Sequence, residues 1–481
     1  MPSWLTATIC AVVVACLNVL FIVRAVTRPN REPASRVAWV MVILLLPAVG
    51  MVAYLFLGET SVGSARRKRL AAAEARMPLP PDEAFVPAAL APRERALFEL
   101  GQSINGFRPV TGNRFELMAD SNAGIDAMVA DIAAARDHVH ISFYIWLDDH
   151  NGGKVADAVA ATARRGVACR VLLDAFGSRA FIKSVRWRQL KDAGVIAVPA
   201  LYDRSRLLRP FQGGRIDLRN HRKIVVIDNR IAYCGSQNCA DPEFRVKPKF
   251  APWVDMLLRC EGPVVLQEQH LFATSWMAER DGNLDTLMRA DDVAPDVQPG
   301  VLAQMFGTGP TTRANAMSEM FTAAMFAAHG ELVITTPYFV PDEAMLRALC
   351  SAPRRGVKTV VVFPRRIDSM LTALSCHSTY QSLLDADVEL FEYPLGLLHT
   401  KSLTLDGEMA LVGSANMDRR SLELNYENNV LISDRATVAA IRGRQAEYLR
   451  ESVRVDRAAV DQWPLARRFA QNAVAMLAPV L

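Results

Sequence analysis

The sequence lacks the motifs that mark a redox, zinc or nucleotide-dependent enzyme. Its eight cysteines show no C-x-x-C spacing, and neither an H-E-x-x-H motif nor a G-x-x-x-x-G-K-[S/T] loop occurs in its 481 residues. We therefore expect the cysteines to be mostly plain buried thiols, and we expect no metal and no cofactor. The formal net charge of +5 is a mild basic excess, which favours an anionic partner without identifying one.

Charge is also missing from two long apolar runs near the amino terminus, residues 5–23 and 37–57. Each is long enough, at 1.5 Å per residue, to cross a hydrocarbon core of about 30 Å. A cleaved signal peptide does not explain the first run, because no basic segment precedes it. The two runs predict a transmembrane hairpin over residues 1–60. Four basic residues lie between the runs and five follow them, so the positive-inside rule leaves the orientation open.

Residues 61–92 are basic, then alanine-rich, then proline-rich, which predicts a juxtamembrane helix and an extended linker. The cluster at residues 66–69 is either a solvated helix end or a contact with anionic lipid, and we favour lipid. A globular region should begin near Arg93.

The globular region repeats itself. The stretch "AAARDHVHISFYIWLDD" around Ile141 corresponds to "AMFAAHGELVITTPYFVPD" around Ile334, and "ATARRGVACRVLLD" corresponds to "SAPRRGVKTVVVFP". Both copies read as alternating helices and continuously apolar strands, which is typical of a sheet covered on both faces. The sequence predicts an α/β protein with two similar α-β-α sandwich halves, at residues 93–290 and 291–481, the second ending in an amphipathic tail.

A chemical motif also occurs twice, at identical spacing. Offsets 0, +2, +7, +14, +15 and +17 carry His, Lys, Asp, Gly, Ser and Asn in both copies. The members are His221, Lys223, Asp228, Gly235, Ser236 and Asn238, and His399, Lys401, Asp406, Gly413, Ser414 and Asn416. Each copy reads as a β-hairpin that sends its His and Lys to one side of a strand. Coincidence between two structural hairpins does not explain six matched positions.

This pair of H-x-K-x-x-x-x-D motifs resembles the phospholipase D superfamily, in which two copies form one active site. One imidazole cannot be nucleophile and leaving-group acid at once, whereas two can share these tasks. By analogy with the family, His221 attacks phosphorus and His399 is the acid; the symmetrical spacing cannot order them. Lys223 and Lys401 neutralise phosphate charge, and Ser236, Asn238, Ser414 and Asn416 are expected to bind the phosphate.

Each histidine needs a carboxylate partner that fixes its tautomer. In the family such a residue follows the motif, and Glu427 matches this position for the second half. Asp255 is the candidate for the first half. Either could instead be an ordinary salt-bridge carboxylate. Asp228 and Asp406 complete the catalytic motif at the hairpin turns, where we expect them to hold the site together without exchanging protons.

Three features choose among phosphodiester substrates. The hairpin places the chain at a bilayer, and six arginines mixed with apolar residues lie just before and beside His221, which suits anionic lipid better than a solvated loop. These are Arg204, Arg206, Arg209, Arg215, Arg219 and Arg222, interleaved with the apolar residues of 207–211. Phe211 is the one aromatic residue within this run, too few for a track of stacked nucleic-acid bases, so we expect no nucleic acid.

The third feature is a finer resemblance. The segments "LLLPAVGMVAYLFLGE", "PWVDMLLRCEGP" and "MLAPVL", with the paired motif, look like bacterial cardiolipin synthases of the phospholipase D type. The resemblance implies an inner-membrane phosphatidyltransferase that uses phosphatidylglycerol and anionic membrane lipids. Alternatives are a hydrolytic phospholipase D, a synthase with another donor such as phosphatidylethanolamine, and a non-catalytic scaffold. The membrane face and the oligomeric state stay open.

Overall fold

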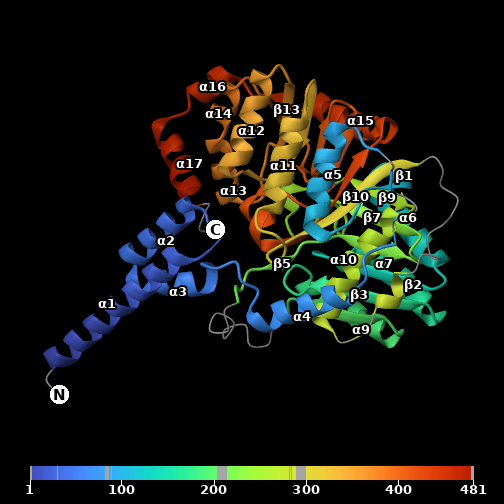
Figure 1. The fold of residues 1–481 in the computed structure, drawn as a ribbon, viewed down its shortest axis with the longest axis horizontal. Coiled ribbons are helices and arrows are strands. Elements are labelled where there is room, and N and C mark those ends of the chain that lie inside the picture. The colour runs from blue at the N-terminus through green and yellow to red at the C-terminus, as the bar shows by residue number, and fades with distance from the viewer. Residues whose placement is uncertain are drawn as a thin grey trace.

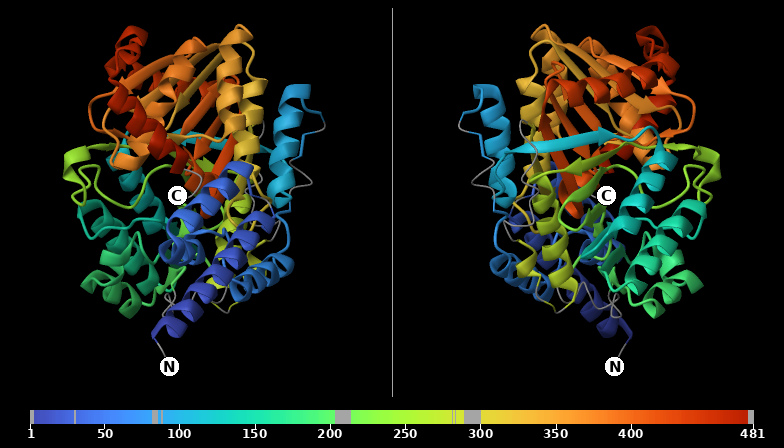
Figure 2. Two further views of the ribbon diagram at one scale, coloured as in Figure 1. Left: turned by 90° about the vertical axis from the view of Figure 1, so that its left-hand side faces the viewer. Right: turned by 90° about the vertical axis from the view of Figure 1, so that its right-hand side faces the viewer.

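The computed structural model describes residues 3–29, 31–81, 86–87, 89–202, 214–280, 282, 284–288 and 300–477. It is an α/β protein whose two similar halves share one continuous mixed sheet (Figure 1). The second half, orange and red, stacks on the green first half (Figure 2), and the amino-terminal helices project away from both (Figure 1). The expected domain boundary at residues 290–291 lies outside the described residues.

The sheet of the first half has a parallel part and an antiparallel part. Parallel strands β2, β3 and β4 continue into the antiparallel strands β6, β7, β9 and β1. Its strands are β1 (Val110–Leu117), β2 (His138–Phe143), β3 (Ala168–Asp174), β4 (Ile196–Ala200), β5 (Arg219–Asn220), β6 (Ile224–Ile227), β7 (Ile231–Gly235), β8 (Trp253–Val254) and β9 (Leu257–Glu261). Its helices are α6 (Ser121–Ala134), α7 (His150–Arg164), α8 (Arg179–Ile182), α9 (Val185–Asp192) and α10 (Val264–Glu279).

The second half repeats this order. Its strands are β10 (Val301–Thr308), β11 (Glu331–Thr335), β12 (Phe339–Val340), β13 (Lys358–Pro364), β14 (Glu389–Tyr393), β15 (Leu397–Leu398), β16 (Ser402–Leu405), β17 (Met409–Gly413), β18 (Met417–Asp418), β19 (Asn425–Ser433) and β20 (Val453–Arg454). Its helices are α11 (Ala316–Ala327), α12 (Glu343–Arg354), α13 (Met370–Ser378), α14 (Tyr380–Asp385), α15 (Arg435–Glu451), α16 (Arg457–Asp461) and α17 (Leu465–Leu477). A π-helical turn, Arg420–Leu424, precedes β19.

The two halves join where β1 pairs with β10 in antiparallel fashion. One hydrophobic cluster beneath α10 and α15 contains residues of both halves, so this core is common to them. Helix α5 (Pro92–Asn105) begins the first half in sequence, but its Leu97 and Phe98 pack in the core of the second half. The halves are therefore not independent packing units, and burial of apolar surface fixes how they face each other.

The amino-terminal region differs from the expected hairpin. Among the described residues, only α1 (Ser3–Thr27) is long and apolar enough to cross a membrane, over Trp4–Thr27. The second apolar run is two helices, α2 (Pro33–Leu45) and α3 (Pro47–Leu57). Pro47 has no N–H and disfavours a helical residue before it, and Leu46 accordingly leaves the helical region at φ −130° and ψ 67°.

Helix α3 folds back against α2 instead of continuing it. A Cβ on Gly50 would lie 2.4 Å from the carbonyl oxygen of Val42, so only glycine allows this close approach. Trp39, Ile43 and Tyr54 form the small core of the helices. At 13 and 11 residues, α2 and α3 reach only about 20 and 16 Å, short of the roughly 30 Å of a hydrocarbon core.

The basic residues after these helices have several different roles. Helix α4 (Ser64–Arg76) forms as expected, but it packs along α10, and Arg66 pairs with Glu279 instead of facing lipid. In the arginine-rich run, Arg215 pairs with Asp217, and Arg222 donates to the carbonyl oxygens of Glu427 and Leu271. Arg204, Arg206, Arg209 and the apolar stretch 207–211 lie outside the described residues.

Candidate active site

Two short strands place the histidines, and each pairs with a strand of the opposite half. Strand β5, which leads into His221, runs parallel to the start of β19. Strand β15, which leads into His399, runs parallel to β8. The backbone N–H of His221 donates to the carbonyl oxygen of Tyr426 at 2.9 Å, and that of His399 donates to Val254 at 2.8 Å. The histidines are thus fixed across the junction between the halves.

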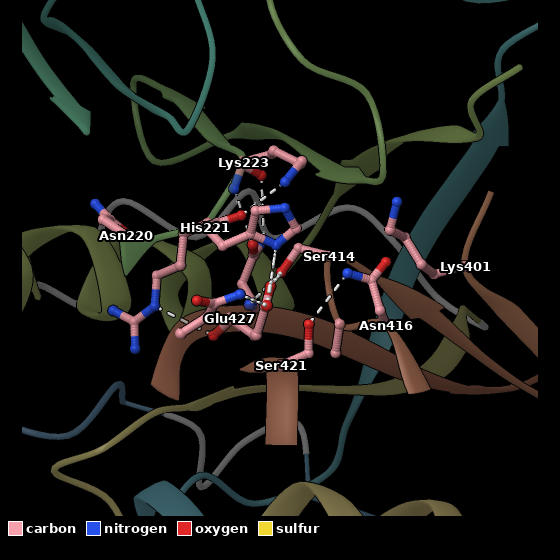
Figure 3. A network of polar contacts seen from close by, with 12 residues as sticks. Asn220, His221, Lys223, Lys401, Ser414, Asn416, Ser421 and Glu427 are labelled. Carbon is pink, nitrogen blue, oxygen red and sulfur yellow. Dashed lines mark hydrogen bonds and ion pairs between the residues drawn. The ribbon is translucent and has the colours of Figure 1, made fainter. Parts of the chain in front are cut away.

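This exchange of strands crosses the carboxylate partners. Nδ1 of His221 lies 2.8 and 2.9 Å from the two carboxylate oxygens of Glu427, and Nδ1 of His399 lies 2.6 Å from Oδ1 of Asp255. The prediction that each carboxylate serves the histidine of its own half is wrong, because β19 and β8 lie beside the opposite motif. Neither half alone holds a complete histidine–carboxylate pair, and Figure 3 shows the pair that His221 forms with Glu427.

The contacts of Nδ1 determine the tautomer of each ring. An ionised carboxylate can only accept a hydrogen bond, so Nδ1 carries the hydrogen in both histidines. Nε2 is then the nitrogen with a free lone pair in the neutral ring. Tyr144 contacts the ring of His221 with a centroid separation of 4.9 Å, and Trp253 contacts that of His399 at 4.5 Å. Both rings are held in one orientation, which suits nucleophilic attack or proton transfer through Nε2.

The two lysines flank the rings from inside the protein. Nζ of Lys223 donates to the carbonyl oxygen of His221 at 2.8 Å, and Nζ of Lys401 donates to that of His399 at 2.6 Å. Both are buried. Burial lowers the pKa of Lys223 to about 8, although Glu427 and Asp255 oppose this effect. Burial likewise lowers the pKa of Lys401 well below its ordinary value, although Asp255 opposes it.

The histidines and their carboxylate partners also have shifted pKa values. Burial lowers the pKa of His221 to about 4 against the effect of Glu427, and burial together with Lys401 lowers that of His399 to about 4. Burial alone would raise the pKa of the Asp255 carboxyl, but His399 and Lys401 lower it, and His221 and Lys223 do the same for Glu427. At neutral pH these shifts favour ionised carboxylates, a charged Lys223 and neutral imidazoles.

The serines of the motif contact the carboxylate partners of the histidines. Oγ of Ser236 donates to Oδ1 of Asp255 at 2.6 Å, and Oγ of Ser414 donates to Glu427. A hydroxyl has one proton, which in this structure is directed to a carboxylate, and phosphate binding by these serines stays a prediction. They position the carboxylates that position the histidines.

The asparagines of the motif make local contacts. Oδ1 of Asn238 accepts from the N–H of Ile145 at 3.2 Å, and Nδ2 of Asn416 donates to Oγ of Ser421 at 3.2 Å. These contacts leave phosphate binding by the asparagines as a prediction.

The motif aspartates lie at the far ends of their hairpins. Asp228 accepts hydrogen bonds from the N–H groups of Arg136, Asp137 and His138, each at 2.8 Å. Asp406 accepts hydrogen bonds from the backbone N–H groups of residues 329–331 and also pairs with Arg93. Each aspartate thus fastens the chain that enters β2 or β11 to its own hairpin, as the expectation that they hold the site together requires.

Sequence reasoning missed a buried network behind Lys223. The side chain of Asn428 accepts from the backbone N–H of Lys223 at 3.0 Å and donates to its carbonyl oxygen at 3.1 Å. It also donates to Glu268, whose pKa burial raises to about 8. Asn428 directly follows Glu427, but no spacing rule connects it with Lys223. Within the described residues there is no cluster of three or more metal-ligating side chains.

Two family models match this chain. The model described as "Cardiolipin synthase, PLD-like domain" matches residues 128–251 and 321–447, one match in each half. The model described as "Phospholipase_D-nuclease N-terminal" matches residues 16–59. These matches cover both histidine motifs and the apolar helices.

Curated relatives match over nearly the whole chain. A cardiolipin synthase A of Erwinia tasmaniensis is 36% identical over 434 residues, covering 89% of this chain and 89% of that protein. A cardiolipin synthase A of Escherichia fergusonii is 35% identical over 465 residues, covering 94% of each chain. Among solved structures, a phosphatidylserine synthase of Haemophilus influenzae Rd KW20 has a TM-score of 0.59 at 13% identity, covering 81% of this chain and 100% of that one. The last likeness concerns the fold alone.

Proposed function

The chain belongs to the cardiolipin synthase family of phospholipase D-type phosphatidyltransferases, and we propose that it transfers the phosphatidyl group of one phosphatidylglycerol to the terminal hydroxyl of a second, releasing glycerol. The observation that carries this proposal is the pair of buried histidines whose Nδ1 atoms contact carboxylates of the opposite halves. That arrangement leaves two Nε2 atoms for a reaction that needs one nucleophile and one acid.

In the first step, Nε2 of His221 attacks the phosphorus of the donor lipid. The P–N bond forms as the P–O bond to glycerol breaks, and the departing oxygen takes a proton from Nε2 of His399. The negative charge of the phosphate raises the pKa of His399 from its low value and allows the ring to carry that proton. Lys223 and Lys401 stabilise the charge that develops on the equatorial oxygens.

In the second step, neutral His399 accepts the proton of the acceptor hydroxyl. The acceptor oxygen attacks phosphorus, the P–N bond breaks, and His221 returns to its neutral form. One phosphodiester is exchanged for another of the same kind, so no energy source is required and the transfer should run in both directions.

The direct test of this activity is exchange in both directions with purified protein. Phosphatidylglycerol alone should yield cardiolipin and glycerol, and cardiolipin with excess glycerol should yield phosphatidylglycerol. Phosphatidylethanolamine offered with phosphatidylglycerol tests the second possible donor. Lipid products are separated by thin-layer chromatography. If phosphatidic acid dominates in both directions, water is the acceptor and the chain is a hydrolase.

We also propose that the protein resides in the bacterial inner membrane, with α1 as its crossing segment and α2–α3 as a pair that enters and leaves on one side. Nε of Arg24, at the end of α1, lies 2.6 Å from Oε1 of Glu59, just after α3. Arg31 donates to the carbonyl oxygen of Gly58 at 2.8 Å and pairs with Glu423 of the second half. Both ends of α2–α3 therefore lie against the catalytic halves.

The carboxyl-terminal helix supports the same placement. In α17, Leu465, Phe469 and Met476 are exposed by 83%, 74% and 75%, whereas Arg467 stacks over the ring of Trp463 at 3.7 Å. Helix α17 runs toward α2 in the views of Figures 1 and 2. An apolar helix face beside membrane helices fits the interface between lipid headgroups and acyl chains.

A single crossing predicts that the amino-terminal end of α1 and the catalytic halves lie on opposite faces of the membrane. Single cysteines in place of Trp4 and of exposed Arg164 report the two positions, in a background with Cys10, Cys16 and Cys350 changed to serine. A membrane-impermeant maleimide added to spheroplasts should label one of the two positions only. Labelling of both, or of neither until the membrane is opened, would show two crossings and restore the simple hairpin.

A further inference from the structure

A cavity of about 520 Å³ opens on the first half beside the active site, and nothing above assigns it a role. It lies between α8, α9, the ends of β3 and β4, and β5. Apolar side chains form its walls, among them Trp187, Leu201 and Ile216, and the half-exposed ring of Phe176 stands at its mouth. A cavity of this size with apolar walls is large enough for part of a lipid.

Four cationic side chains and one carboxylate line this cavity. The cations are Arg179, Lys183, Lys191 and Arg219. Among the described residues, no carboxylate forms an ion pair with Arg179, Lys183 or Lys191, while Lys191 stands 5.2 Å from the ring centroid of Trp187. The carboxylate is Asp174, whose oxygens already accept from the N–H groups of Phe176, Gly177 and Asn220. The cavity therefore offers positive charge to an anion from outside.

The cavity is connected to the reaction centre through strand β5. The guanidinium of Arg219 stacks on Phe176 at 4.3 Å, inside the cavity, and His221 follows Arg219 by two residues. Two residues of extended chain span at most about 7 Å. A phosphate held beside Arg219 would thus lie about one glycerol unit from a phosphorus atom bound at His221.

The opposite edge of the cavity adjoins the membrane helices. Arg215, next to the lining residue Ile216, donates through its side chain to the carbonyl oxygen of Leu57 at the end of α3 and through its backbone N–H to Ser61 at 2.8 Å. A lipid could therefore enter this cavity along α3 while its headgroup reaches the reaction centre.

We propose that this cavity binds the acceptor lipid through its own, non-reacting phosphate. The inference rests on the proposed transfer, in which donor and product share one glycerol bridge between two phosphates. The donor phosphate occupies the histidines, so the second phosphate needs a separate cationic site one glycerol unit away. The cations of the cavity supply that site, and its apolar walls take the adjoining acyl region. In the reverse reaction the same site holds the distal phosphate of cardiolipin.

The test measures how one phosphatidyl-enzyme intermediate divides between two acceptors. Phosphatidylglycerol vesicles are given with butan-1-ol, an acceptor without phosphate, and the ratio of cardiolipin to phosphatidylbutanol is measured. For the variant Arg179→Ala/Lys183→Ala/Lys191→Ala we expect this ratio to fall about tenfold, the size expected when several exposed ionic contacts are lost together. Arg188→Ala, an exposed change on α9 outside the cavity, should leave the ratio unchanged. Lys183→Arg/Lys191→Arg keeps the charges and should keep the ratio within twofold of wild type.

Different outcomes overturn the acceptor site and the proposed function. A ratio for the alanine variant within twofold of wild type overturns the acceptor site, and so does a parallel loss of both products, because that would place the donor in the cavity. Failure of the proposed function is separate, since wild-type protein would then form phosphatidic acid and no cardiolipin.

Discussion

His221→Asn lowers cardiolipin formation by at least about 10⁴-fold, and His399→Asn lowers it by about 10²–10⁴-fold. The first change removes the nucleophile, without which the two-step route is closed. The second removes the group that protonates departing glycerol and then deprotonates the acceptor. Asparagine keeps a donor near the Glu427 or Asp255 carboxylate, so the buried carboxylates retain a partner. His150→Asn, at an exposed histidine that starts α7, is the matched control and should keep full activity.

A donor with a good leaving group separates the two roles. Phosphatidyl-p-nitrophenol needs no acid for its departure, so His399→Asn should release one equivalent of nitrophenol and then stop, because its intermediate lacks a base for the acceptor. His221→Asn should release none. A one-equivalent burst from His221→Asn instead would exchange the roles of the two histidines.

Lys223→Ala and Lys401→Ala each lower kcat by about 10²–10³-fold while the protein remains folded. Each removes a fixed positive charge that matters most when phosphorus becomes pentacoordinate. The lowered pKa values of the two lysines mean that folding acts against their charged forms, so their removal relieves a cost and should not reduce the melting temperature by more than a few degrees.

Asp406→Ala provides the contrast with the lysine variants. It deprives three backbone N–H groups and Arg93 of their acceptor, far from the reacting nitrogens, so it should lose melting temperature and soluble yield. The test measures the melting temperature and kcat of Lys223→Ala, Lys401→Ala and Asp406→Ala. Stable Asp406→Ala protein without activity, beside lysine variants that unfold, would reverse these assignments.

Local spacing accounts for what the sequence predicts well. The two α/β halves follow from apolar strands that alternate with helices, and the H-x-K pairs lie on hairpins because strand alternation and turn residues are local properties. The histidines and lysines of the candidate site could thus be proposed without a structure. The resemblance carried by the same residues gave the family to which the chain belongs.

Long-range pairing accounts for what the sequence predicts badly. Glu427 and Asp255 were assigned by chain distance from their own motifs, but the parallel pairing of β5 with β19 and of β15 with β8 brings each to the opposite histidine. The second apolar run has the composition of a membrane span, and Pro47 breaks it. Six arginines look alike in sequence, yet Arg215 and Arg222 make internal contacts while Arg219 lines a cavity.

The covalent intermediate on one histidine of a composite site is the central claim, and trapping it is its most direct test. Wild-type protein is mixed with phosphatidylglycerol labelled at phosphorus, quenched in denaturant at alkaline pH, where an N-linked phosphoryl group survives, and digested for mass spectrometry. The account predicts an acid-labile phosphatidyl group on the peptide that contains His221, absent from His221→Asn. Label on the His399 peptide would contradict the assigned roles, and rapid turnover with no label on either histidine would contradict the covalent mechanism.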